Sequence, residues 1–170
     1  MKVNINPNTI DMNYRYKMDS VNIQLTGQGK NSHTVITNII PICEMINTDP
    51  SILLNYMGNI LGTSINIDIM AIKGHYTIDI IQNIIFQFIK FATLCNKCNI
   101  PELTPNVIKN NKNYSLHMKC SACGSSYELI GNNKINQKLV DMICKYYSIH
   151  DFIPKKGNMV INDFESQMII

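Results

Sequence analysis

The sequence predicts an α+β protein: a small mixed α/β domain, with a sheet covered by helices on one side, followed by a four-cysteine zinc ribbon. Two observations support this prediction. Short segments of strand-like alternation are interspersed with segments of helical periodicity over residues 21–92. Two Cys-x-x-Cys pairs then follow, with 21 residues between them, and we place the ribbon at residues 93–131.

The chain is expected to begin with an extended arm and two strands. Residues 1–20 show neither helical nor strand periodicity, and Pro7 among several asparagines favours an irregular arm. Alternation with a period of two predicts a strand at residues 21–26, which Gly27 ends, and a second short strand at residues 33–37.

Local signals then predict two helices. Asn38 is a candidate N-cap for a helix at residues 39–46, with Pro41 in its first turn. Asp49 is the candidate N-cap of the next helix, because Pro50 follows it at the first helical position. Gly62 is suited to end that helix.

A strand pair and the longest helix complete the first domain. Residues 65–69 alternate as a strand, and residues 71–75 are expected to pair with it. Thr77 is the candidate cap of a helix that runs almost to Cys95. The residues expected to point inward from this helix are Ile78, Ile81, Ile85, Phe88 and Ile89. We expect the first domain and the ribbon to pack as separate cores.

The ribbon prediction depends on the spacing of its cysteines. Both sulfurs of a Cys-x-x-Cys pair can reach one ion at about 2.3 Å, and the second pair completes a tetrahedron. The expected ligands of a structural Zn²⁺ are Cys95, Cys98, Cys120 and Cys123. Gly124 follows the second pair and suits a tight turn. Residues 104–112 are expected to be turn-like, whereas 114–119 and 127–130 are expected to be strands.

Other uses of these cysteines have less support. Two disulfides, or a redox pair beside an unrelated pair, are the alternatives. The N-terminus has no apolar signal region, which favours a reducing, cytoplasmic location. Four thiolates leave no open position on the ion, so we expect His117 to be a solvated strand residue. Cys43 and Cys144 are expected to be buried core thiols.

The C-terminal part, residues 132–170, is predicted to hold one helix and a tail. Residues 135–147 place Leu139, Val140, Ile143 and Tyr147 at helical spacing. Residues 148–170 show no regular pattern. No apolar run reaches the roughly 18 residues of a membrane span, so we expect no membrane partner.

Basic residues are almost all lysine. The formal net charge is only +3, too small by itself to indicate nucleic-acid binding, and Arg15 is the single arginine among 15 basic residues. A guanidinium can grip phosphate oxygens with two parallel hydrogen bonds, which lysine cannot do. Chance, or stacking of Arg15 on Tyr14 or Tyr16, remains an alternative.

Motifs along most of the chain resemble, in type and order, those of a known protein family. They are Val3-Asn4-Ile5-Asn6, Tyr14-Arg15-Tyr16-Lys17-Met18, Gly27-Gln28-Gly29, Thr34-Val35-Ile36, Tyr56-x-Gly58-x-x-Leu61-Gly62 and Cys120-x-x-Cys123-Gly124. In their order the chain resembles the N-terminal domain of eukaryotic translation initiation factor 5. It is also similar to the related beta subunit of initiation factor 2.

The resemblance implies a GTPase-activating protein without an active site of its own. Its target would be the gamma subunit of initiation factor 2, in a complex with GTP and initiator Met-tRNA. The small ribosomal subunit, with mRNA and rRNA, would lie nearby. The resemblance places the catalytic arginine, supplied in trans, at Arg15. The implied GTPase-contacting residues are Tyr14, Tyr16, Lys17, Lys30 and His33.

The sequence departs from the family at two basic positions. His33 and Asn55 stand where lysines are associated with activity, so one cation is weaker and the other is absent. Lys30 is available in the first loop, whereas Asn55 has no evident substitute. The family's C-terminal helical-repeat domain has no counterpart in these 170 residues.

Two other functions stay open. Leu61-Gly62-Thr63-Ser64 and Ile72-Lys73-Gly74-His75-Tyr76 resemble a non-catalytic beta subunit as much as a GTPase activator. The arm, however, has neither an amphipathic helix nor a lysine-rich block for anchoring on a gamma subunit. A ribosome- or RNA-binding ribbon is the third possibility, with a thin basic patch of Lys109, Lys112, Tyr114 and Lys119.

Overall fold

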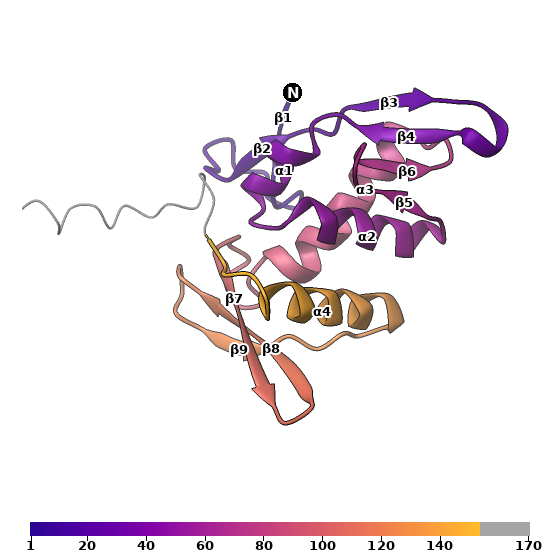
Figure 1. Ribbon diagram of the computed structural model, residues 1–170. Coiled ribbons are helices and arrows are strands. Elements are labelled where there is room, and N and C mark those ends of the chain that lie inside the picture. Colours follow the sequence, from indigo (N-terminus) through magenta and orange to yellow (C-terminus); the bar gives the residue numbers. More distant parts are fainter. Residues whose placement is uncertain (154–170) are drawn as a thin grey trace, which may run out of the picture.

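The computed structural model describes residues 1–153, which form three antiparallel sheets and four α-helices (Figure 1). The strands are β1 Lys2–Asn4, β2 Lys17–Asp19, β3 Ile23–Thr26, β4 His33–Ile36, β5 Ile65–Asn66, β6 Ala71–Lys73, β7 Leu103–Asn110, β8 Asn113–Cys120 and β9 Ser126–Glu128. The helices are α1 Ile39–Met45, α2 Pro50–Leu61, α3 Ile78–Phe88 and α4 Lys134–Tyr147, with a 3-10 turn at Gly29–Asn31 and a π-helical turn at Ile89–Thr93. The mixed α+β class is confirmed.

The N-terminal residues form a hairpin. Strands β1 and β2 pair antiparallel, with Val3 opposite Met18, so the extended arm expected over residues 1–20 contains two paired strands. Ile5, Tyr16 and Met18 are buried against the core. The paired strands have three residues each and lie far apart in the chain, so no local periodicity indicates them.

The central sheet has the strand order β3-β4-β6-β5. Thr34 lies opposite Ile72, and both are fully buried. Helices α2 and α3 lie along one side of this sheet (Figure 1), and α2 contacts β5 and β6. The predicted strand at 65–69 is shorter than expected, because only Ile65 and Asn66 pair with β6.

The helix signals are confirmed at α2 and α3. Asp49 accepts a hydrogen bond from the Ser51 amide at 2.8 Å, and Gly62 ends α2 with a φ of 63°. Thr77 accepts from the Ile80 amide at 3.4 Å and caps α3. Ile78, which we expected to point inward, is 49% exposed because it lies in the first turn of α3, away from the core.

Asn38 does not cap α1 with its side chain. Its amide donates instead to the Ser20 carbonyl, and its oxygen accepts from the Asn22 amide, both at 2.8 Å. The side chain thereby ties the β2–β3 connection to the start of α1.

The ribbon sheet has the order β7-β8-β9. Strand β7 covers most of residues 104–112, which we expected to be turn-like, because Val107 and its neighbours pair in register with β8. Helix α4 packs against α2 on one side and against β7 and β8 on the other. The buried apolar residues of both parts form one cluster, so the expectation of two separate cores is wrong.

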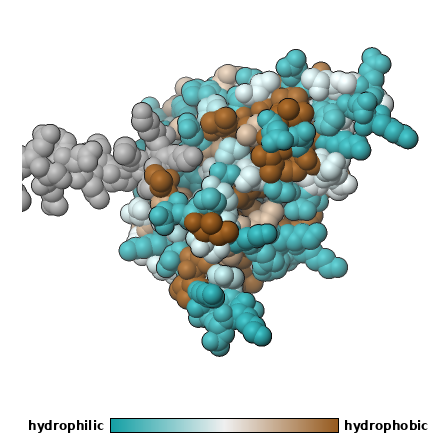
Figure 2. Space-filling view, viewed as in Figure 1, coloured by the Kyte–Doolittle hydropathy of each residue, from teal (hydrophilic) through white to brown (hydrophobic). Residues whose placement is uncertain are grey.

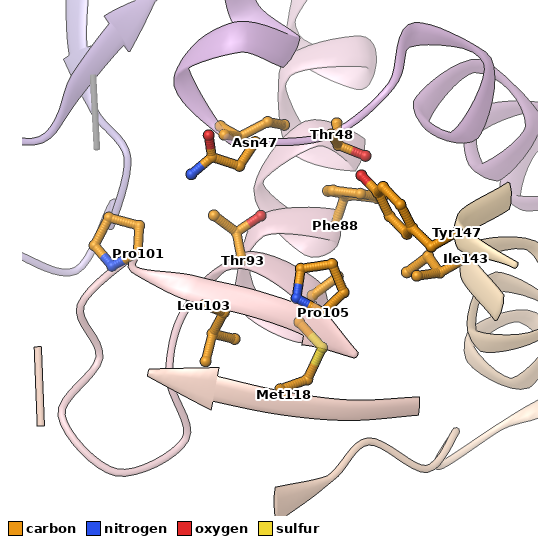
Figure 3. Close-up of a pocket in the computed structure, with 12 residues that line it drawn as sticks. Asn47, Thr48, Phe88, Thr93, Pro101, Leu103, Pro105, Met118, Ile143 and Tyr147 are labelled. Atoms are coloured by element: carbon orange, nitrogen blue, oxygen red, sulfur yellow. The ribbon is translucent and has the colours of Figure 1, made fainter. Parts of the chain in front are cut away.

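A small cavity of about 30 Å³ marks this junction. Figure 3 shows Thr93 facing Leu103 and Pro105 of β7, with Ile143 and Tyr147 of α4 closing the cavity on another side. Residues from α3, its π-helical extension, β7 and α4 therefore line one cavity where the two parts meet. Within residues 1–153 no helix is both long and apolar enough to cross a bilayer.

Candidate functional site

The four cysteines of the two pairs converge at one end of the ribbon. Their sulfur atoms all lie within 4.8 Å of one another. Cys95 Sγ is 3.7 Å from Cys123 Sγ, and Cys98 Sγ is 3.6 Å from Cys120 Sγ. Four sulfurs at about 2.3 Å from a tetrahedral ion lie about 3.8 Å apart. The donor set and its spacing therefore fit a tetrathiolate metal site.

The two knuckles repeat one backbone pattern. Asn99 donates its amide to the Cys95 carbonyl at 2.9 Å, and Gly124 donates to the Cys120 carbonyl at the same distance. Both residues have a positive φ, 57° for Asn99 and 74° for Gly124. Sequence reasoning identified Gly124 but missed Asn99, although asparagine tolerates this conformation better than most residues.

Hydrogen bonds make Cys123 the most acidic of these thiols. Ser125 Oγ lies 2.6 Å from Cys123 Sγ, and this contact, with the Ser125 backbone, lowers the pKa of Cys123 to about 6. Burial raises the pKa of Cys98 to about 12. A bound divalent cation favours the thiolate form of every ligand. The site is suited to holding structure, because four sulfur ligands leave no position for a substrate.

The remaining cysteines and the ribbon histidine lie elsewhere. Cys43 and Cys144 are buried in the apolar cluster, as expected. His117 is half-buried on β8 and lies opposite Asn106 of β7. It is not among the four residues whose ligand atoms converge.

Arg15 lies exposed in the N-terminal hairpin, two residues before the start of β2. Its guanidinium carbon is 4.9 Å from the centre of the Tyr16 ring. The only ion pair within residues 1–153 joins Lys2 to Asp19, so no carboxylate neutralises Arg15 in that part of the chain. The arrangement presents a cation to solvent on an aromatic support.

Tyr16 connects this hairpin to the ribbon. Its hydroxyl donates a hydrogen bond to the Glu102 carboxylate, which lies between the first knuckle and β7. Tyr16 is 8% exposed and Glu102 is 6% exposed. Burial, then the hydrogen bond and charge of Glu102, raises the pKa of Tyr16 to about 12. The sequence holds no signal for this contact, because the partners are 86 residues apart.

The other expected contact residues fall into two groups. Tyr14 packs 5.5 Å from Tyr16, ring centre to ring centre, and Lys17 Nζ is 3.4 Å from the Met12 carbonyl. Lys30 and His33 belong to the β3–β4 hairpin, whose turn lies far from β1 and β2 (Figure 1). Tyr14, Tyr16 and Lys17 therefore lie beside Arg15. Lys30 and His33 lie in a separate part of the surface.

The two departures from the family have defined surroundings. His33 Nδ1 lies 2.8 Å from the Asn31 carbonyl oxygen, and His33 is opposite Lys73 on β6. The Asn55 side chain donates to the Ser51 carbonyl at 2.8 Å within α2. Lys145 of α4 lines the same surface groove as Asn55. A lysine is thus present beside this position, which sequence spacing could not reveal.

Comparison with known proteins places this fold in a family. The model of the domain found in initiation factors 2B and 5 matches residues 6–126. Eukaryotic translation initiation factor 5 of Caenorhabditis elegans is 32% identical over 140 residues, which cover 80% of this chain and 31% of that protein. The Saccharomyces cerevisiae factor of the same name is 30% identical over 128 residues, which cover 73% of this chain and 31% of that protein.

The factor from Drosophila melanogaster is 29% identical over 142 residues, covering 81% of this chain and 30% of the relative. The chain thus spans about a third of the length of these relatives. The family match covers most of the chain, including the N-terminal hairpin loop, the central sheet and all four cysteines. The chain therefore belongs to the family of translation initiation factors that share the domain found in initiation factors 2B and 5.

Proposed function

We propose that this chain acts as a GTPase-activating protein for the gamma subunit of initiation factor 2, in the preinitiation complex that carries GTP and initiator Met-tRNA. Arg15 is the catalytic group and is supplied in trans, so the chain needs no active site of its own. Tyr14 and Lys17 contact the GTPase beside it, and Lys30 and His33 form a second contact region. Tyr16, which the resemblance also implied as a contact, is buried and supports Arg15 from inside the hairpin. The small ribosomal subunit, with mRNA and rRNA, lies nearby, and the protein works in the cytoplasm.

One observation supports this proposal most strongly: an exposed arginine on an anchored hairpin. The base of the hairpin is fixed in the core by three buried side chains, those of Ile5, Tyr16 and Met18. Arg15 faces solvent and has no ion-pair partner among residues 1–153. A group that must enter another protein's nucleotide site needs this combination of exposure and fixed support. A flexible arm would lose more conformational entropy when it binds.

The energetics of phosphoryl transfer agree with this role. Charge accumulates on the phosphate oxygens in the transition state, and a guanidinium supplied in trans accelerates comparable GTPases by about 10³- to 10⁵-fold. Lysine can supply the charge but not the planar fork. Arg15 is the only residue of the chain with that fork.

We also propose that Cys95, Cys98, Cys120 and Cys123 hold one structural Zn²⁺. The sulfur separations and the repeated knuckle pattern support this assignment. The ion closes the ribbon, and the ribbon in turn carries Glu102, the partner of Tyr16. The metal thereby helps to position the hairpin but takes no part in the chemistry.

The decisive experiment replaces Arg15 with lysine. GTP hydrolysis would be measured in single turnover on the purified complex of initiation factor 2, GTP and initiator tRNA, with binding measured separately. Arg15→Lys should lower stimulated hydrolysis at least about tenfold with little change in binding. Equal stimulation by both proteins would refute the role of Arg15.

The two departures from the family define a second outcome. If the wild-type chain binds the GTPase without stimulating it, His33 and Asn55 become the expected cause. The double variant His33→Lys/Asn55→Lys should then recover stimulation. Failure to recover it would favour the non-catalytic, beta-subunit-like function.

A further inference from the structure

The charge of this protein is unevenly divided between its two parts. Residues 1–92 carry six basic and six acidic side chains, whereas residues 93–153 carry seven lysines and four carboxylates. One of those carboxylates, Glu102, is buried under Tyr16. All seven lysines are exposed, and none has an ion pair within residues 1–153. The excess positive charge therefore lies on the ribbon and α4.

Three of these lysines meet around one aromatic ring. Strand β8 presents Tyr114 on the same face as buried Leu116 and Met118, which is the face that packs on α4. Tyr114 lies past the covered part of that face and is 46% exposed. Lys109 is directly opposite it on β7. Lys112, at the hairpin turn, and Lys145, from α4, line one cleft together with Tyr114.

The cleft between the hairpin tip and the C-terminal half of α4 has a volume of about 640 Å³. Its single carboxylate, Asp141, accepts a hydrogen bond from Gln137 at 3.1 Å. The lower end of the molecule, where Figure 1 places the β7–β8 tip, is covered by hydrophilic side chains (Figure 2). We propose that this cleft binds single-stranded nucleic acid, with phosphates on Lys109, Lys112 and Lys145 and a base stacked on Tyr114.

This partner fits better than an acidic protein or a membrane. An exposed ring among lysines is the combination that single-stranded nucleic acid uses, because every base offers a face for stacking and every nucleotide a phosphate. An acidic protein segment needs the cations but not the ring. A membrane surface needs several apolar side chains at the same place, whereas Ile108 is the only aliphatic side chain of β7 and β8 that is exposed.

The charge of the metal site does not cancel this attraction. Zn²⁺ with four thiolates would carry a net charge of about −2. That site adjoins Cys120, the last residue of β8, whereas the cleft is at the other end of the same strand. Tyr114 and Cys120 are six positions apart along β8, or about 20 Å at about 3.4 Å per residue. The distance exceeds twice the Debye length of about 8 Å at physiological salt.

The structure also supplies a matched control. Lys119 lies on β8, but five residues from Tyr114, so it projects from the opposite face of the hairpin. The basic patch of Lys109, Lys112, Tyr114 and Lys119 expected from the sequence is therefore not a single surface. The surface around Tyr114 includes Lys145 of α4 but not Lys119.

The test is a fluorescence-anisotropy titration of the full chain with an oligouridylate of about twelve nucleotides, between about 50 and 200 mM KCl. Three phosphate contacts predict a slope of log affinity against log salt of about −2. Tyr114→Ala should weaken binding about five- to hundred-fold, and Tyr114→Phe should retain it. Lys112→Gln should weaken binding and flatten the slope by about 0.7, whereas Lys119→Gln should change neither.

Several results would overturn the proposal. They are an unchanged affinity of Tyr114→Ala, equal binding of a duplex of the same length, equal losses for Lys112→Gln and Lys119→Gln, and the absence of binding. Binding to phosphatidylserine vesicles in place of the oligonucleotide would assign the cleft to membranes instead. The inference does not depend on GTPase activation, because Arg15 lies on the N-terminal hairpin and none of these variants alters it.

Discussion

The hydrogen bond from Tyr16 to Glu102 should stabilise the whole chain, and Tyr16→Phe tests this directly. The variant removes one hydroxyl and leaves a buried carboxylate, 6% exposed, without its donor. An unsatisfied buried polar group costs about 1–3 kcal/mol, and a charged group lies toward the upper end. For a chain of this size, each kcal/mol shifts Tm by about 2–4 °C. We therefore expect Tm to fall by about 4–10 °C.

Two matched variants make the measurement interpretable. Glu102→Gln keeps an oxygen that can accept from Tyr16, so its loss should be smaller. Tyr14→Phe removes the same atom from the neighbouring ring. The Tyr14 hydroxyl lies near the Asn6 backbone but makes no hydrogen bond of good geometry within residues 1–153, so we expect a change of at most about 0.5 kcal/mol.

The pH dependence gives an independent signature. Burial and Glu102 raise the pKa of Tyr16 to about 12, above the value of about 10 for an unfolded tyrosine. The folded state then holds this proton more tightly than the unfolded state. The contribution to stability is complete below about pH 10 and is lost as pH rises through about 12. Tyr16→Phe should flatten that alkaline loss in urea titrations.

Equal unfolding free energies for Tyr16→Phe and Tyr14→Phe would refute the reasoning. They would mean that the Glu102 carboxylate finds other partners, or water, when the tyrosine hydroxyl is absent. A flat alkaline profile in the wild-type chain would contradict it independently.

Three further outcomes are expected. Metal analysis of protein purified without chelator should find about one Zn²⁺ per chain, and a zinc content near zero would contradict the tetrathiolate assignment. Gly27→Ala should destabilise the chain more than Gly29→Ala in urea unfolding. Both glycines have a positive φ, so both substitutions are strained. A Cβ at Gly27 would also lie 1.9 Å from the Asn31 carbonyl oxygen, whereas a Cβ at Gly29 would meet nothing within 4 Å. Asp49→Ala should lower the free energy of unfolding by about 2 kcal/mol, because Asp49 caps α2 and also accepts a hydrogen bond from the Tyr146 hydroxyl. Tyr146→Phe removes only the second of these interactions and should show about half that loss in the same urea measurement. A larger loss for Tyr146→Phe than for Asp49→Ala would argue against the cap.

Local chemistry explains what could be predicted from the sequence. The ends of α2 depend on Asp49, Pro50 and Gly62, which act within a few residues of one another. The convergence of the four cysteines likewise follows from short spacings and one tetrahedral geometry. In both cases the physical cause lies inside the pattern itself.

Long-range pairing explains what could not be predicted. Residues 104–110 show little alternation of their own, and they extend because β8 supplies a partner in register. The contact of the N-terminal hairpin with the ribbon joins residues 86 apart. Lys145 reaches the groove of Asn55 only because α4 packs on α2. None of these contacts produces a pattern that can be recognised in a short segment of sequence.

The shared core also changes what metal removal should do. With separate cores, chelation would unfold the ribbon and leave residues 21–92 folded. The ribbon, however, carries Glu102, and its buried residues form one cluster with those of the first domain. Loss of the metal should therefore remove the partner of Tyr16 and loosen the hairpin that presents Arg15.

Hydrogen exchange can measure this coupling between metal and hairpin. A chelator should speed exchange at the β1–β2 amides, such as the Ile5 amide, which donates to the Tyr16 carbonyl at 3.0 Å. The Leu53 amide, within α2, is the internal reference. In the Tyr16→Phe variant the hairpin amides should already exchange faster before chelation, so the chelator should increase their exchange rate by a smaller factor than in the wild-type chain. Unchanged hairpin protection after full metal loss would show that Glu102 keeps its place without the ion, and that the ribbon does not control the position of Arg15.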